Sequence, residues 1–193
     1  TRSGGSWSYE ILDDQGRAGN TSGLALGPDG TLHVVWHNMD TNNFEYAHRE
    51  NGSFSFSTIA HGLTEASART PEILFDDTGA VHVVYVGFEG LYHAFRDSGA
   101  WTIDIAVDNG YMGQSGAVLG ADGRIHAVFD TQRFLMHAVL GDDGTWTTEE
   151  TGLEGDYPSL ALDGDGNLLM SFEEGDGFSL AGTGPVPPWV GQD

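Results

Sequence analysis

Alternating apolar and polar positions divide the chain into short strands joined by tight turns. The clearest example runs from Leu24 to Trp36, where an apolar strand, a Gly-Pro-Asp-Gly turn and a second alternating strand follow one another. The same pattern returns at 73–85, 118–129 and 160–172. Each copy has a glycine in its turn, at Gly30, Gly79, Gly123 and Gly166. The steps of 49, 44 and 43 residues between these glycines indicate a repeat architecture.

Two further short strands complete each repeat. One begins at an aromatic residue, at Trp7, Phe54, Trp101 and Trp146, and the other follows at 44–47, 91–94, 135–138 and 178–181. Four short antiparallel strands per unit of about 45 residues predict one blade of a β-propeller. We therefore expect an all-β fold of four four-stranded blades in a single domain, 1–182. Its repeats are about 7–53, 54–100, 101–145 and 146–182, and a tail follows at 183–193.

The repeat order gives the N-terminal segment 7–12 the role of an outer strand. It is predicted to pair with the last blade, 158–182, and to close a ring of four blades without exposed sheet edges. A fragment of a larger ring, or two half-rings meeting in a dimer, remain as alternatives. Trp189 stands where a further outer strand would start, but the prolines of Gly182–Pro188 favour a tail.

Four segments carry a family resemblance: the Ser-Leu-Ala-Leu-Asp run and Gly-rich turn within 155–167, the His-Val-Val-Tyr strand at 82–85, the Tyr-Ala pair at 46–47 and the Asn-Gly-Ser-Phe turn at 51–54. These segments resemble a bacterial β-propeller repeat family. The resemblance spans residues 2–182 and implies the propeller fold. It leaves the activity open, because such propellers carry many functions. The Ser-x-Asp-x-Gly-x-Thr-Trp box of sialidases is missing.

Net charge and composition limit the classes of molecule that this protein is expected to bind. The 193 residues include 29 acidic and 7 basic side chains, for a net charge of −22, and contain no cysteine. A field of this sign repels nucleic acid and anionic membranes, and no apolar run is long enough to cross a membrane. We therefore expect a small-molecule or glycan ligand, no nucleic acid, no membrane insertion, and a monomer or homodimer. We also expect an extracellular location or a location on the bacterial cell surface.

Two sets of residues could bind a divalent metal such as calcium, zinc or copper. His33, His82 and His126 occupy the same strand position in three repeats, and three imidazoles with an open position are typical of catalytic metal sites. The competing interpretation is that they pack within the blades. Asp163, Asp165 and Asn167 alternate as in the first half of a calcium loop. Here the alternative is ordinary turn chemistry, because Asp and Gly favour tight hairpin turns.

The longer loops gather on one face of the predicted disc, where variable loops usually carry function. The candidate ligand-binding residues on this face are Arg17, His37, Asn38, Arg69, Tyr111, Asp130, Arg133, Tyr157 and Glu173. The three arginines could clamp a carboxylate, or each could pair with a neighbouring acid. No Gly-x-Ser-x-Gly elbow and no phosphate-binding loop is present.

These features favour a lectin-like, ligand-binding propeller that uses its loop face or the grooves between blades. Because its sites would recur with the repeat, several ligands per chain are expected. Two alternatives remain: a metal-dependent enzyme built on the three histidines, and a structural or interaction domain of a larger surface protein. The residue pattern leaves open whether the protein is an enzyme.

Overall fold

The computed structural model describes residues 7–63, 68–108 and 113–184, and all regular structure in these ranges is β-strand. The strands are β1 (Ala18–Leu26), β2 (Leu32–Asn38), β3 (Asn43–Glu50), β4 (Ser53–Ala60), β5 (Arg69–Phe75), β6 (Val81–Val86), β7 (Gly90–Arg96), β8 (Thr102–Asp108), β9 (Ser115–Leu119), β10 (Ile125–Asp130), β11 (Phe134–Leu140), β12 (Trp146–Glu154), β13 (Asp156–Leu162), β14 (Leu168–Glu174) and β15 (Gly177–Gly182). The described residues contain no helix able to cross a membrane.

The strands form four antiparallel sheets, each built from consecutive strands. The first blade is β1–β4, the second β5–β8, the third β9–β12 and the fourth β13–β15. Neighbouring blades pack through their inner strands, β1 on β5, β5 on β9 and β9 on β13. The predicted all-β propeller architecture is therefore confirmed.

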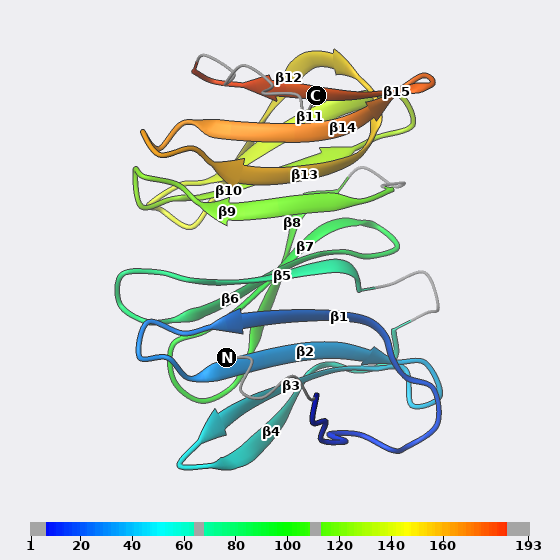
Figure 1. Cartoon of the computed structure of the whole chain (residues 1–193), viewed down its shortest axis with the longest axis vertical. Helices are drawn as coiled ribbons and strands as arrows, with labels where there is room; N and C mark the ends of the chain where they lie inside the picture. Colours follow the sequence, from blue (N-terminus) through cyan, green and yellow to red (C-terminus); the bar gives the residue numbers. More distant parts are fainter. Residues whose placement is uncertain (1–6, 64–67, 109–112, 185–193) are drawn as a thin grey trace.

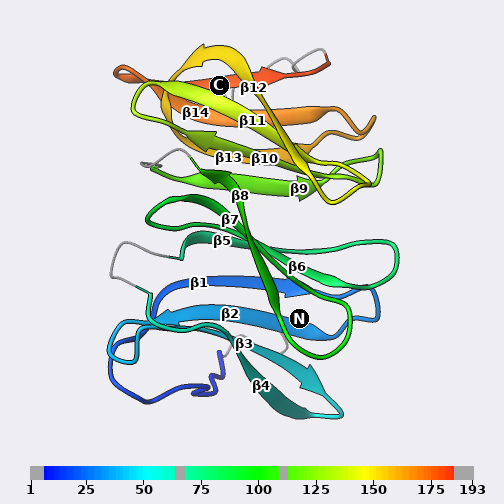
Figure 2. The same ribbon diagram turned by 180° about the vertical axis from the view of Figure 1, so that it is seen from behind.

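The blades are stacked along the long axis of the molecule (Figure 1). The first blade lies at one end of the stack and the fourth at the other, and the view from behind shows the same order (Figure 2). We call the side with the β2–β3, β6–β7, β10–β11 and β14–β15 turns, and the connections into β5, β9 and β13, the loop face.

The hairpins on the opposite side are fixed by their own side chains. In the first blade, Asp29 accepts hydrogen bonds from the Thr31 amide at 2.8 Å and the Thr31 hydroxyl at 2.7 Å, and Gly30 has a φ of 81°. A residue with a Cβ atom is strained at this φ, so the turn requires glycine. The glycine that recurs at this position in all four blades, with φ between 78° and 83°, therefore sets this type of turn.

Apolar clusters between neighbouring blades form the core. Val35, Phe44 and Tyr46 of the first blade meet Val83 and Tyr85 of the second. A second cluster joins the second and third blades, and a third, smaller cluster joins the third and fourth. Because each blade is apolar on both faces, it gains stability mainly by being stacked on a neighbour.

The predicted pairing of the N-terminal strand with the last blade is not observed. The fourth blade has three strands, and residues 7–12 form no strand. The carboxylate of Asp13 accepts a hydrogen bond from Trp36 Nε1 at 2.9 Å, which ties this segment to the first blade. The first and fourth blades stand at opposite ends of the stack, so the N-terminal segment lies away from β15. The predicted position of Trp189 lies outside the described residues.

Candidate functional site

A polar hollow opens on the loop face where the second, third and fourth blades meet. It encloses about 310 Å³ and is lined mainly by Arg69, Gln114, Asp130, Gln132, Asp156 and Tyr157. These residues come from the start of β5, the connection into β9, the end of β10, the turn that follows it and the start of β13. We call this space the loop-face hollow. Three of the predicted loop-face residues, Arg69, Asp130 and Tyr157, are brought together here.

Asp130 lines the loop-face hollow and accepts hydrogen bonds from the backbone around it. Its side chain is only 2% exposed. One carboxylate oxygen accepts hydrogen bonds from the amides of Gly113 at 2.6 Å and Gln114 at 2.9 Å, and the other accepts from the amide of Tyr157 at 3.0 Å. A Cβ atom at Gly113 would overlap this carboxylate, so the close approach requires glycine. Asp130 therefore joins the third blade to the start of the fourth.

Backbone strain is concentrated around the same space. Tyr157 has a φ of 54°, and Ala68 and Thr70, which flank Arg69, have φ values of 56° and 44°. Positive φ is uncommon outside glycine, and for a β-branched residue such as threonine it is an outlier. Backbone outliers of this kind cluster at active sites and ligand-binding sites. At Tyr157 it holds the aromatic ring at the rim of the loop-face hollow, with the residue 60% exposed.

Two of the predicted arginines lie outside the hollow, in ion pairs. Arg17 Nε is 2.8 Å from Asp40, and Arg133 Nη2 is 2.6 Å from Glu154. The hydrogen bond from Arg17 holds the pKa of Asp40 below its usual value. The predicted clamp of three arginines is therefore not assembled, because two of them pair with nearby acids.

The remaining candidate ligand-binding residues that the structure describes lie outside the loop-face hollow. His37 and Asn38 are buried at the end of β2, and Glu173 lines a separate hollow beside Phe178. Asn38 donates to Asp13 at 3.1 Å and organises the loop around it. His37 has no hydrogen-bond partner for either ring nitrogen in the described ranges, and burial lowers its pKa. Tyr111 lies outside the described residues.

The three repeated histidines are not brought together. Each hydrogen-bonds across its own sheet, in the pairs His33–Tyr46 at 2.6 Å, His82–His93 at 2.9 Å and His126–His137 at 3.0 Å. Among residues 7–63, 68–108 and 113–184 there is no cluster of three or more His, Cys, Asp or Glu side chains that could hold a metal ion. The predicted metal site is absent from these ranges because the second strand of each blade directs its histidine toward the third strand of the same blade.

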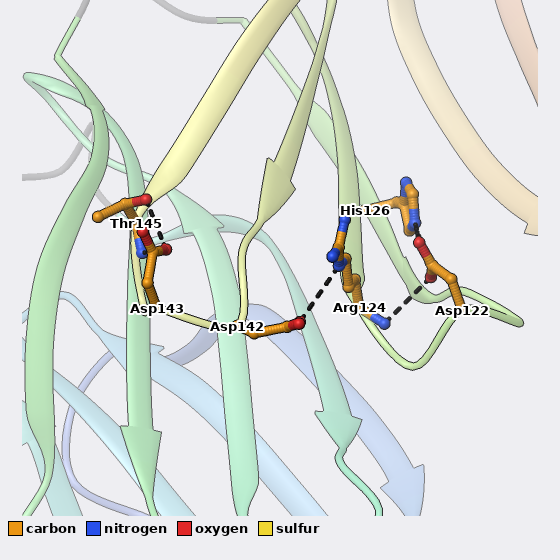
Figure 3. Close-up of polar contacts among 6 residues, drawn as sticks. All are labelled: Asp122, Arg124, His126, Asp142, Asp143 and Thr145. Carbon is orange, nitrogen blue, oxygen red and sulfur yellow. Dashed lines mark hydrogen bonds and ion pairs between the residues drawn. The ribbon is translucent and has the colours of Figure 1, made fainter.

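In the third blade, the repeated histidine His126 also contacts an acidic residue of the preceding turn. His126 Nε2 lies 3.1 Å from the carboxylate of Asp122, and Arg124 Nε lies 3.2 Å from Asp142 across the neighbouring turn (Figure 3). In the second blade the corresponding pair is buried, and burial lowers the pKa of His93 to about 4. A second cause is the neighbouring His82. The rings of His82 and His93 are stacked, with centroids 5.1 Å apart, so both imidazoles pack within the second blade.

The predicted calcium ligands form a turn. One Asp163 oxygen accepts hydrogen bonds from the Asp165 amide at 2.9 Å and the Asn167 amide at 2.8 Å, and the other accepts from Asn167 Nδ2 at 2.9 Å. The Asn167 side chain is the main cause of the lowered pKa of Asp163. Since both oxygens are engaged within the turn, the alternative of ordinary turn chemistry describes this segment.

Gln114, Gln132 and Asp156 complete the loop-face hollow. The repeat pattern also places these three residues in loops of this face, but they are not among the nine candidate ligand-binding residues. A second hollow, between the third and fourth blades, was also not foreseen. The repeat pattern carried no signal for this second hollow, because it places an aromatic residue, Trp189, at the expected distance after Trp146, and Trp189 lies outside the described residues.

No protein-family model and no curated protein matches this chain. Among solved structures, a protein of unknown function from Dyadobacter fermentans superposes with a TM-score of 0.58 and 14% identity, over 78% of this chain and 56% of its own. A triple arginine mutant of AofleA from Arthrobotrys oligospora gives 0.57 and 16%, over 86% and 56%. An α-L-arabinofuranosidase from Clostridium thermocellum gives 0.50 and 11%, over 83% and 66%.

The chain spans little more than half the length of the first two of these structures. At such low identity the likeness concerns the backbone arrangement, because one fold hosts many functions. Together with the four stacked antiparallel sheets, it identifies the chain as an all-β protein of propeller architecture.

Proposed function

We propose that the protein binds a neutral saccharide in the loop-face hollow. The observation that carries this proposal is the combination of a polar space of about 310 Å³ with an exposed aromatic ring, Tyr157, held at its rim by a strained backbone. Small-molecule sites usually have volumes of about 300–1,000 Å³, so this space suits one or two sugar rings.

The lining side chains match the chemistry of sugar hydroxyls. Each hydroxyl both donates and accepts hydrogen bonds, and the hollow offers donors on Arg69 and the amides of Gln114 and Gln132, with acceptors on those amides and on Asp156. The face of Tyr157 can stack on the apolar side of a sugar ring. The net charge of −22 disfavours anionic glycans, so a neutral saccharide is the ligand class.

Binding is favoured over hydrolysis. Both oxygens of Asp130 already accept hydrogen bonds from backbone amides, so this carboxylate is committed to the fold and is a poor candidate for a general base. The described residues also lack a clustered metal site. Two solved structures of similar fold are named as an α-L-arabinofuranosidase and a putative gluconolactonase, which supports sugar recognition as a class without assigning chemistry.

The test is calorimetric titration with neutral mono- and disaccharides found by glycan-array screening. We expect one site per chain, because the residues corresponding to Asp130 in the other blades are His37, Val86 and Glu173, and the hollow is not repeated. This differs from the several sites expected from the repeat pattern.

The decisive variant is Tyr157→Asn. Asparagine tolerates positive φ better than tyrosine, so the fold is retained while the ring is lost. We expect at least a tenfold loss of affinity, in line with about 1 kcal/mol or more for an aromatic contact. The matched control is Phe178→Ser, which removes another exposed aromatic ring outside the hollow and should bind like the parent. Equal binding by Tyr157→Asn, or no binding of any neutral saccharide, would support the interaction-domain alternative instead.

A further inference from the structure

A mainly apolar hollow of about 300 Å³ lies between the third and fourth blades, beside the inner strands through which they pack. We call it the interblade hollow. Its walls include His137 and Glu149 on the third blade, and Leu168, Met170, Ala181 and Thr183 on the fourth. Because the hollow is open to solvent and mainly apolar, it is a surface of the kind that another protein segment commonly covers.

The other blade interfaces show what fills this position. Trp101, just before β8, packs on Tyr46 of the preceding blade with ring centroids 5.1 Å apart. Trp146, at the start of β12, packs on His93 in the same way at 5.6 Å. His137 holds the corresponding place on the third blade. The fourth blade has three strands, so within the described ranges no outer strand delivers an aromatic ring to His137.

The N-terminal segment carries the missing element. Trp7, Tyr9 and Ile11 alternate like the apolar residues of the other outer strands, and they are 97%, 91% and 69% exposed. Three large apolar side chains in such exposure, spaced for one face of a strand, indicate a surface that is covered by something else.

We propose that residues 7–11 of one copy of this chain form the outer strand of the fourth blade of a second copy, with Trp7 seated in the interblade hollow. The exchange is reciprocal, as a two-fold symmetric dimer requires. Each chain then contributes half of one closed ring, and the open edge of β15 is paired.

The register of this pairing follows from the three complete blades. Ala47 lies opposite Phe56, Ala94 opposite Ile103 and Ala138 opposite Thr148. Each of these partners is two residues after the aromatic residue that begins its outer strand. By the same spacing, Tyr9 of one copy lies opposite Ala181 of the other. Because Ala181 lines the interblade hollow, Trp7 falls on the side that faces His137.

A second copy, rather than the same chain, is the occupant for a structural reason. The segment is held on the first blade by Asp13–Trp36 and by an ion pair of 3.2 Å between Glu10 and Arg49. This blade lies at the end of the stack opposite β15 (Figure 1). If the fourth blade of a second copy docks on the first blade of this chain, residues 7–11 already lie beside it.

The two ends of the stack are suited to such docking. Leu24, Leu26 and Phe56 are exposed on the first blade, and Phe178 and Leu180 on the fourth. Since each chain carries −22 charges, repulsion opposes association at low ionic strength, and added salt should strengthen the dimer.

The test uses the absence of native cysteines. Tyr9→Cys and Ala181→Cys are made in separate chains, which are mixed at about 0.5 M salt and oxidised. Residues directly opposite on paired strands have Cβ atoms about 4.5–5.5 Å apart, close enough for a disulfide after a small adjustment. We expect a linked heterodimer of twice the 20.6 kDa of one chain, which only pairing between chains can produce.

The matched control is Ser8→Cys mixed with Ala181→Cys. A shift of one residue turns the side chain to the other face of the strand, so we expect at least tenfold less crosslinked product. Equal yields for the two mixtures, or no crosslink in either, would overturn the proposal. A chain carrying both Tyr9→Cys and Ala181→Cys that crosslinks only within itself when diluted would also overturn it, in favour of ring closure by one chain.

Sedimentation provides a readout without cysteines. We expect the parent to dimerise, and Trp7→Ser to raise the dissociation constant at least tenfold. Phe88→Ser, which removes an exposed aromatic ring in the β6–β7 turn, should leave it unchanged. A parent that stays monomeric at high protein and salt concentration, or a Trp7→Ser variant that dimerises like the parent, would contradict the proposal.

Discussion

The interface between the second and third blades and the interface between the third and fourth are built from the same repeat but are filled differently. In the first, Trp146 covers His93, and the imidazole is buried. In the second, His137 borders a hollow of about 300 Å³. The inner strands pack at both interfaces, through β5–β9 and β9–β13. The difference therefore lies at the outer strand.

This contrast shows that a blade does not complete its own core. Trp101 and Trp146, at the outer strands of the second and third blades, each pack on the blade before, so an interface depends on a strand that lies further along the chain. In the fourth blade, where the described residues 113–184 include no outer strand, the inner strands still stack and the interface has a hollow at its periphery. Stability in such arrays is a sum over neighbouring interfaces, and each interface can be tested separately.

The largest effect is expected from Trp146→Ala. This variant leaves a cavity between the second and third blades, like the hollow between the third and fourth. We expect the free energy of unfolding to fall by about 4 kcal/mol, because a large aromatic contact is lost and a cavity remains beside His93. Urea denaturation monitored by circular dichroism measures this loss.

Trp146→Phe is the matched control. The indole nitrogen of Trp146 is buried without a hydrogen-bond partner among the described residues, so replacing the indole by a benzyl ring should cost less than about 1.5 kcal/mol. If Trp146→Ala were as stable as the parent, the aromatic contact would contribute little to the interface, and the outer strand would not account for the difference between the two interfaces.

A somewhat smaller effect is expected from pH, through His93. Burial lowers its pKa from the ordinary 6.5 to about 4 in the folded chain. Between these values the unfolded chain binds a proton that the folded chain does not, so stability falls as the pH is lowered from 6.5 toward 4. The loss approaches about 3 kcal/mol at pH 4. It is measured by urea denaturation at a series of pH values.

His93→Gln removes the titrating group while keeping a polar side chain beside His82. We expect this variant to have a flatter stability profile between pH 4 and 6.5 than the parent. In Trp146→Ala, solvent reaches His93, so its pKa, followed by NMR, should rise toward 6.5. An unchanged slope in His93→Gln would assign the pH dependence to other groups.

The smallest of the three effects is expected from Asp130→Asn, at the open interface. The carboxylate accepts from three backbone amides and links the third blade to Tyr157 of the fourth. An amide places an NH₂ group against one of these donors, so we expect a loss of about 2 kcal/mol. Thermal unfolding measures it, and Asp165→Asn, in an exposed turn, is the control with little expected change. Equal stability of Asp130→Asn and the parent would show that this link contributes little.

Much of the fold could be predicted from the sequence. The alternation of apolar residues predicts the strands, the glycine-containing turns predict the hairpins, and the period predicts the blades. Even the register of Ala47, Ala94 and Ala138 with their outer strands follows the repeat. These features are local, because period and turn chemistry depend on residues within one unit.

The candidate site was only partly predictable. Arg69, Asp130 and Tyr157 were selected as loop-face residues and meet in the loop-face hollow, whereas Arg17 and Arg133 pair with nearby acids. Equivalent positions in the repeat suggested a single site formed by His33, His82 and His126, but each is held within its own blade. Residues at equivalent positions of a repeat lie at matching places in different blades, so they need not be close to one another in space.

The sequence by itself determined the strands, the turns and the number of repeats, because each depends on contacts within about 45 residues. Only the tertiary structure decided which side chains of different blades converge, which backbone positions are strained around Arg69 and Tyr157, and where residues 7–13 are held. These outcomes depend on how one blade is set against the next. That geometry comes from packing between residues far apart in the chain, and no local pattern encodes it.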